Sequence, residues 1–271
     1  MTQPYIPTRA NDPHGLFWFE TRPRHLAGGG DPRRITQTLR AAGWHNLSDP
    51  DFPHVVLASP DRRHSLVLEP RPGPYGRWWR IRGQQEQGSW YSEFGAHTPV
   101  EILAALTDAL LEPAPDHSPD IWPQLTAAGW HYQRDEHGNE DACHPDGRLH
   151  LRRFSDKALG FHWLAEATFG EPHERVWRAW LDDRMPRHLL AAFAKALASD
   201  EPVQRSRGDV PHLHLVTQEE RGPQAEQLAA EHEARLKAVG AAARRARRTA
   251  ARSTPGAPPA PAPSSRPAAR R

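Results

Sequence analysis

The residues of this sequence best suited to hold a metal ion are its 17 histidines and its single cysteine. His212 and His214 would place two imidazoles on one face of a strand, and Cys143 precedes His144 with His150 close behind. None of these groups has the tight paired spacing of a structural zinc site. We therefore expect hydrogen-bonded or solvent-facing histidines, no metal site and no cofactor.

Residue types that could act as catalytic acids or nucleophiles have simpler explanations. Asp61 and Asp146 each follow a proline in an expected hairpin turn, where aspartate is favoured because it bonds its own backbone. Cys143 adjoins His144, but sequence adjacency does not give nucleophile–base geometry. Glycines 28–30 lack the lysine of a phosphate-binding loop, so we expect a flexible connector. The sequence predicts a non-enzyme, with an enzyme of unknown reaction as the minor alternative.

Neighbouring tryptophans give one candidate binding surface. Trp78 and Trp79 lie on an expected strand, so their side chains point to opposite faces. Trp78 then shares its face with Arg80 and Arg82, and such an aromatic and cationic surface can stack on bases or hold a protein. The alternative is that a second part of the chain covers this face.

Charge is distributed unevenly along the chain. The totals are 35 Lys+Arg and 33 Asp+Glu, but residues 234–271 hold ten basic residues and no acidic one. Removing these ten leaves 25 basic against 33 acidic residues, a balance of −8, in residues 1–233. Arg244, Arg245, Arg247 and Arg248 therefore become candidates for contact with nucleic-acid phosphates. The alternative is a solvated basic tail without a partner.

The sequence lacks the marks of a membrane or secreted protein. No segment approaches the ~18 uninterrupted apolar residues of a spanning helix. The first residues contain no apolar core of a signal peptide, and the single cysteine excludes an intrachain disulfide. We expect a cytoplasmic protein that contacts no membrane.

The chain contains an internal repeat. Segment 39–45 recurs as 125–131, and segment 99–110 recurs as 186–197, in the same order and at nearly the same offset. Such collinear matches indicate a duplication.

Each unit reads as a helix, about four antiparallel strands and a second helix. Gly43 is expected to end the first helix in a left-handed conformation, as Gly129 does in the second copy. Thr98 and Glu101 are expected to form a capping box before the last helix of the first unit. Segment 175–181 could be strand or helix. The prediction is an α+β fold whose helices cover one face of the strands, with the units packed as a pseudo-dimer.

The predicted organisation has five parts. They are an N-terminal extension with a possible strand (1–30), a first repeat unit (31–112), a second, degenerate unit (118–200), a strand plus an Ala/Glu/Arg-rich helix (210–252), and a disordered Pro/Ala/Arg tail (253–271). The helix has a thin apolar stripe, so we expect it to be exposed or to pack only on a partner.

Several motifs together resemble a known family. Segments 57–61, 66–70, 78–81 and 90–95, ending in the Thr-Pro-Val-Glu motif at 98–101, are similar to the actinobacterial Domain of Unknown Function 317 family. The resemblance implies two tandem domains in a cytoplasmic actinobacterial protein. It implies no activity, cofactor or catalytic residue.

These observations favour a non-catalytic binding or adaptor protein with a protein partner. The alternative is a nucleic-acid-associated protein that uses the Arg-rich C-terminal segment.

Overall fold

A computed structural model describes most of the chain. The described residues are 18–69, 77–86, 88–117, 119–156, 160–170, 174–220 and 225–253. The first part of the N-terminal extension and nearly all of the predicted disordered tail lie outside them. No helix within the described residues is long and apolar enough to cross a membrane.

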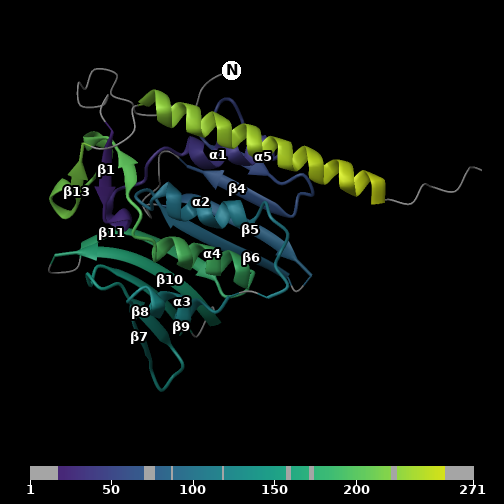
Figure 1. Ribbon diagram of the computed structural model, residues 1–271. Coiled ribbons are helices and arrows are strands. Elements are labelled where there is room, and N and C mark those ends of the chain that lie inside the picture. Colours follow the sequence, from purple (N-terminus) through teal and green to yellow (C-terminus); the bar gives the residue numbers. More distant parts are fainter. Residues whose placement is uncertain are drawn as a thin grey trace, which may run out of the picture.

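Ten strands form one continuous antiparallel sheet (Figure 1). The first repeat supplies β2 (His45–Asn46), β3 (Val55–Ala58), β4 (His64–Leu68), β5 (Arg77–Gln85) and β6 (Gly88–Gly95). The second supplies β7 (His131–Arg134), β8 (Glu140–Cys143), β9 (Leu149–Asp156), β10 (Gly160–Phe169) and β11 (Glu174–Asp182). The order across the sheet is β2-β3-β4-β5-β6-β11-β10-β9-β8-β7, so the second half mirrors the first.

A layer of helices covers one face of this sheet. It contains α1 (Arg33–Ala41), α2 (Val100–Ala109), α3 (Ile121–Ala127) and α4 (Arg187–Leu197). Helix α1 packs on α2, α2 on α4, and α4 on α3, which repeats the mirror order of the strands. The long helix α5 (Ala225–Ser253) runs along α1 (Figure 1). The predicted α+β fold and the pseudo-dimer of two units are confirmed.

The two repeats meet where β6 pairs with β11. Phe94, Glu93 and Ser92 face Ala179, Trp180 and Leu181, respectively, in antiparallel register. Above this seam, the ring of Phe94 meets that of Phe193 on α4 at 5.8 Å between centroids. Strand β11 covers segment 175–181, so the helical alternative for that segment is wrong.

Alternation along the strands builds a single core. Leu68, Trp79, Phe94, Ala179 and Ala165 occupy one cross-strand row under the helices, and all are buried. Each unit has five strands rather than about four, because the short edge strands β2 and β7 add to the expected meander. Their polar sequences carry no apolar alternation from which a strand could be recognised.

The helix ends follow the sequence prediction only in part. Gly43 and Gly129 have φ values of +98° and +84° and end α1 and α3, as expected. The capping box at α2 is wrong: the buried Thr98 hydroxyl has no hydrogen-bond partner among the described residues, and Pro99 immediately precedes the helix. Glu101 is instead engaged by Arg205, a partner from far along the chain.

A second, three-stranded sheet joins the two ends of the described chain. The expected N-terminal strand is β1 (Phe19–Arg22), which lies between β12 (Val203–Arg205) and β13 (Thr217–Glu219). The strand expected to carry His212 and His214 is wrong: Leu213–Leu215 forms a 3₁₀ turn, η4, and β13 follows it. His212 and His214 therefore do not share a strand face.

The glycine run is a packed junction and not the flexible connector that the sequence suggested. A Cβ atom on Gly28 would lie 2.4 Å from the carbonyl oxygen of Asp209. A Cβ atom on Gly30 would lie 2.7 Å from Cζ of Arg205. Only glycine permits this close approach of three segments.

Arg205 and Glu101 form a buried ion pair at this junction. Two guanidinium nitrogens of Arg205 donate to the two carboxylate oxygens of Glu101 at 2.9 and 2.6 Å, and one also donates to the carbonyl of Gly28. Burial would raise the pKa of Glu101, but the charge and hydrogen bonds of Arg205 outweigh it and hold this pKa below its usual value. The pair ties the three-stranded sheet to α2.

We predict that Glu101→Gln destabilises the protein by about 3–5 kcal/mol at neutral pH, because it leaves a buried guanidinium without its counter-charge. The lowered pKa means that the stabilisation is complete above the unfolded-state pKa of Glu101 and is lost as pH falls through the folded-state value. The difference in free energy of unfolding between wild type and variant should therefore become smaller below about pH 4. Urea unfolding at several pH values measures this difference. The exposed Glu112→Gln on the same side of the fold is the control, and equal stability of both variants would contradict the prediction.

Candidate functional site

The face of the large sheet opposite the helix layer is open. Within the described residues no helix covers it (Figure 1). Arg80, Glu93, Trp180, Leu164 and Arg152 follow one another across five strands on this face, in direct register. We call this surface the open face.

A row of rings crosses the open face. Tyr91 lies 6.0 Å from Trp180, Trp180 lies 5.7 Å from His162, and His162 lies 4.1 Å from Phe154, all between ring centroids. These four residues, the aromatic row, come from β6, β11, β10 and β9. The row therefore crosses the seam and exists only when both repeats are paired.

The predicted surface around Trp78 is changed by its neighbours. Trp78 is half-buried and packs against the core, and its ring also approaches Gly29. Arg80 does lie on the open face, but its guanidinium is bound by Glu69. Arg82 is exposed and lies over the ring of Tyr91 at 5.2 Å. The structure thus joins Arg82 to the aromatic row and leaves Trp78 at its margin.

The charges of the open face are largely compensated. Besides Arg80 with Glu69, Arg152 lies 3.5 Å from Asp141, and Arg175 lies 4.0 Å from Glu166. These three arginines already have carboxylate partners, so most of the positive charge around the aromatic row is compensated, and Arg82 remains exposed over Tyr91.

Cys143 meets the ring of His150, one of the two histidines that the sequence grouped with it, and not the ring of its neighbour His144. Its sulfur lies 3.5 Å from Nε2 of His150, and Nδ1 of His150 lies 3.2 Å from Asp141. Burial, with the negative charge of Asp141, raises the pKa of the Cys143 thiol, which opposes formation of a nucleophilic thiolate. The strands here are paired on both sides, so their backbone N–H groups serve the ladder and do not form an oxyanion hole. This arrangement does not favour catalysis.

A second histidine cluster joins the N-terminal segment to the second repeat. His25 lies in the 3₁₀ turn η2 (Arg24–Leu26), and its Nε2 is 2.9 Å from Oδ2 of Asp146. Nδ1 of His144 is 2.8 Å from Oδ1 of the same carboxylate. Asp146 also accepts a hydrogen bond from the backbone of Arg148, which confirms its predicted role in the turn.

The protonation states of this cluster follow from its surroundings. Burial lowers the pKa of His25, although Asp146 acts in the opposite direction. Burial would raise the pKa of Asp146, but hydrogen bonds from His144 and His25 hold it well below its usual value. Asp146 is therefore a carboxylate and His25 a neutral imidazole at neutral pH.

The sequence prediction did not include this cluster because His25 is distant from the other two residues in the chain. The available signal was a difference between the repeats: Ser59 precedes the Pro-Asp turn in the first repeat, where His144 precedes it in the second.

The C-terminal helix is docked on the first repeat. Arg235 donates to both carboxylate oxygens of Asp108 at 2.6 and 2.5 Å, and His232 Nε2 lies 2.7 Å from Oε1 of Gln37. Gly240 is buried against the end of α1. The expectation that this helix is exposed or packs only on a partner is therefore wrong.

The predicted arginines lie on the far half of α5. Arg244, Arg245, Arg247 and Arg248 are all exposed, and none has a carboxylate within ion-pair distance among the described residues. The guanidinium of Arg247 reaches the end of α1, 3.2 Å from where a Cβ atom on Gly43 would lie. These four arginines are on the helix side of the molecule, apart from Arg80 and Arg82.

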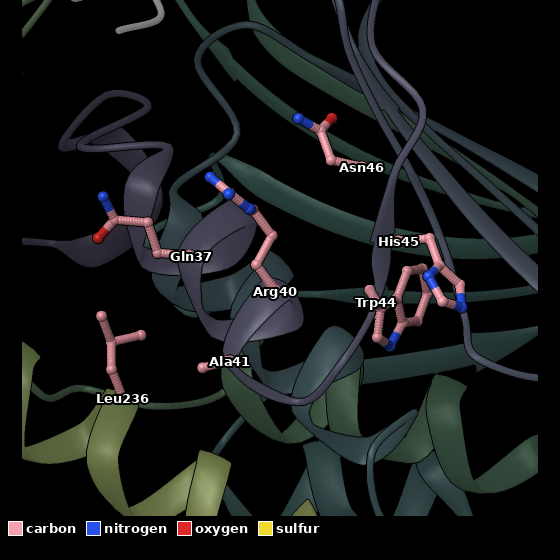
Figure 2. Close-up of a pocket in the computed structure, with 7 residues that line it drawn as sticks. All are labelled: Gln37, Arg40, Ala41, Trp44, His45, Asn46 and Leu236. Carbon is pink, nitrogen blue, oxygen red and sulfur yellow. The ribbon is translucent and has the colours of Figure 1, made fainter. Parts of the chain in front are cut away.

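A hollow lies beside the first half of α5, where Leu236 faces α1. Figure 2 shows the residues that line it: Gln37, Arg40, Ala41, Trp44, His45, Asn46 and Leu236. Leu236 comes from α5, and the others come from α1 and the segment that follows it. The polar members are hydrogen-bond donors or neutral groups, and no carboxylate lines the hollow.

Comparison with known proteins identifies the repeated unit. A family model described as SPDY, domain of unknown function (DUF317), matches residues 58–116 and 144–203. No curated protein and no solved structure matches the chain. The two matched regions cover equivalent parts of the repeats, each from the hairpin before β4 or β9 to the segment after α2 or α4. The chain therefore carries two regions that match the DUF317 (SPDY) domain, as two tandem copies.

Proposed function

We propose that this protein is a non-catalytic binding protein whose helix α5 contacts the phosphate backbone of nucleic acid. The observation that carries the proposal is the set of four exposed arginines without carboxylate partners, Arg244, Arg245, Arg247 and Arg248. Some arginines elsewhere, such as Arg80 and Arg153, are bound by carboxylates. The exposed Arg82, Arg134 and Arg178 also lack an ion pair among the described residues, but they do not belong to a cluster of four on one helix. Unpaired guanidinium groups are the ones free to replace the counterions of a phosphate backbone.

Helix geometry gathers these four side chains. At ~100° per residue, they fall within an arc of about 160° on one side of α5. The docking of the preceding half of α5 on α2 through Arg235, and on α1 through Gly240, fixes the direction in which this arc points. A fixed array of this kind loses less conformational freedom on binding than a flexible basic tail.

The neighbouring hollow extends the donor surface. Arg40 and the side-chain amides of Gln37 and Asn46 line it, next to the helix end that Arg247 reaches. Guanidinium and amide groups of this type commonly donate to phosphate oxygens. The rest of the chain, with its balance of −8 in residues 1–233, repels a polyanion, so binding is confined to the α5 side. The proposal includes a cytoplasmic location, where nucleic acid is accessible.

We predict that Arg244→Gln/Arg248→Gln weakens binding to both duplex and single-stranded DNA. Loss of two phosphate contacts should reduce the slope of log affinity against log salt by about 1.4–1.8. Fluorescence anisotropy with labelled DNA of mixed sequence, at several salt concentrations, measures affinity and slope together. Glutamine retains helix propensity, so α5 should stay folded.

The charge-matched control is Arg134→Gln/Arg178→Gln, which removes two exposed arginines from the second repeat. This control should bind as wild type does. Absence of binding by wild type, or an equal loss in both double variants, would refute the role of α5.

A second candidate function is supported by the open face. Its aromatic row, flanked by Arg82 and by compensated ion pairs, has the composition of a protein-binding surface and not of a phosphate-binding one. Tryptophan, tyrosine and arginine are the residue types that most often dominate protein interfaces. The partner would present an apolar centre with mixed charges around it. With nucleic acid on α5, a protein on the open face would make this chain an adaptor.

We predict that Trp180→Ala abolishes nuclease-resistant capture of the protein partner from native lysate. Trp180 lies at the centre of the aromatic row, where truncation of a binding residue typically costs 2 kcal/mol or more, about thirtyfold in affinity. The control is Tyr132→Ala, because Tyr132 is also an exposed aromatic residue but packs beside Trp122 on the helix side. If the two variants are equally stable and capture the partner equally well, the open face is not the binding surface.

A further inference from the structure

The cluster of His25, His144 and Asp146 lies apart from both proposed binding surfaces. Each residue offers one ligand atom, and the three atoms lie within 4.8 Å of one another. We infer that this cluster is a binding site for one divalent transition-metal ion of the zinc type, held by two imidazole nitrogens and one carboxylate oxygen.

The ligand types fit such an ion. Zinc binds imidazole nitrogen and carboxylate oxygen at ~2.0–2.2 Å, so a tetrahedral ion needs its ligand atoms about 3.4 Å apart. Both imidazole nitrogens already point at the carboxylate, at 2.9 and 2.8 Å, so an ion would take the place of the two shared protons. Each ring would then carry its proton on its other nitrogen. Ion binding would therefore require side-chain rotations that bring the three atoms, now within 4.8 Å of one another, to this spacing.

The first repeat shows that the turn does not need these histidines. There, Asp61 accepts hydrogen bonds from Ser59 and from the backbone of Arg63, which is all that the hairpin requires. In the second repeat, Asp146 bonds the backbone of Arg148 in the same way and gains two imidazoles in addition. The two histidines are therefore an addition to a turn that folds without them.

Tryptophans of the second repeat contact both histidines, one at the backbone and one at the ring. The indole Nε1 of Trp177 donates to the backbone carbonyl of His25 at 2.7 Å, and Trp130 meets the ring of His144 edge-on. In the first repeat the equivalent indole nitrogen, that of Trp90, is buried with no partner among the described residues. His25 thus completes a contact that only the second repeat makes, and this contact fixes the backbone of η2 beside the turn that carries His144 and Asp146.

The site can be reached from solvent. The side chain of Asp146 is 26% exposed and that of His144 is 17% exposed, whereas that of His25 is 4% exposed. Three protein ligands leave one position of a tetrahedral ion for water. The ion would fix η2 to the hairpin between β8 and β9 and so join the N-terminal segment to the second repeat.

The test is zinc binding by the full chain, measured by competition with a chromogenic chelator and by metal analysis after dialysis. Wild type should bind one zinc ion per chain. His144→Ser, which installs the residue of the first repeat, and Asp146→Asn should each lose this stoichiometric binding. Asp61→Asn makes the same change in the turn of the first repeat and should bind zinc as wild type does.

Cobalt separates this site from Cys143. Cobalt bound by the cluster should give visible d–d absorption without the near-ultraviolet charge-transfer band of a thiolate ligand, and His150→Ser should leave the spectrum unchanged. The inference is overturned if wild type takes up no zinc, if His144→Ser or Asp146→Asn still binds one ion, or if the cobalt spectrum shows a thiolate. The unfolding temperature should rise with zinc in wild type, in Asp61→Asn and in His150→Ser, but not in His144→Ser or Asp146→Asn.

Discussion

The pairing of β6 with β11 is the contact on which the rest of this molecule depends. It joins residues 92–94 to residues 179–181 and turns two five-stranded units into one sheet. Because the strands are continuous, the helices above them share one core, and α2 packs directly on α4. The same seam brings Tyr91 of one repeat beside Trp180 of the other. A binding surface on the open face therefore belongs to neither repeat alone.

The segments outside the repeats remove the symmetry that the seam creates. Helix α5 docks on α1 of the first repeat, whereas His25 docks on the turn of the second. Arg205 then connects the three-stranded sheet to α2, through a glycine run that admits its guanidinium. Each candidate site on the helix side thus forms where a segment from outside the repeats packs on one repeat and not on the equivalent position of the other.

Local patterns in the sequence predicted local structure well. The helix-ending Gly43 and the turn aspartates depend on residues next to them in the chain, and the duplication is visible as matching segments. The structure confirms all three. Contacts between distant segments were not predictable in this way. The Thr98 cap fails because Arg205 engages Glu101, and the sequence did not indicate the contact of His25 with Asp146, because spacing within a segment says nothing about a partner from elsewhere in the chain. The four arginines of α5 were found because charge runs need no partner to be recognised.

The two outer edges of the sheet have a consequence for assembly. Each repeat has one long edge strand, β6 or β11, and one blunt edge, β2 with two residues or β7 with four exposed polar ones. The backbone groups of the two long edge strands bond to each other at the seam, and short or polar edge strands resist pairing with a further strand. Growth of the sheet is therefore self-terminating at two repeats. A third copy appended to this chain could not join by the same contact, and the sheet offers no template for open-ended polymerisation.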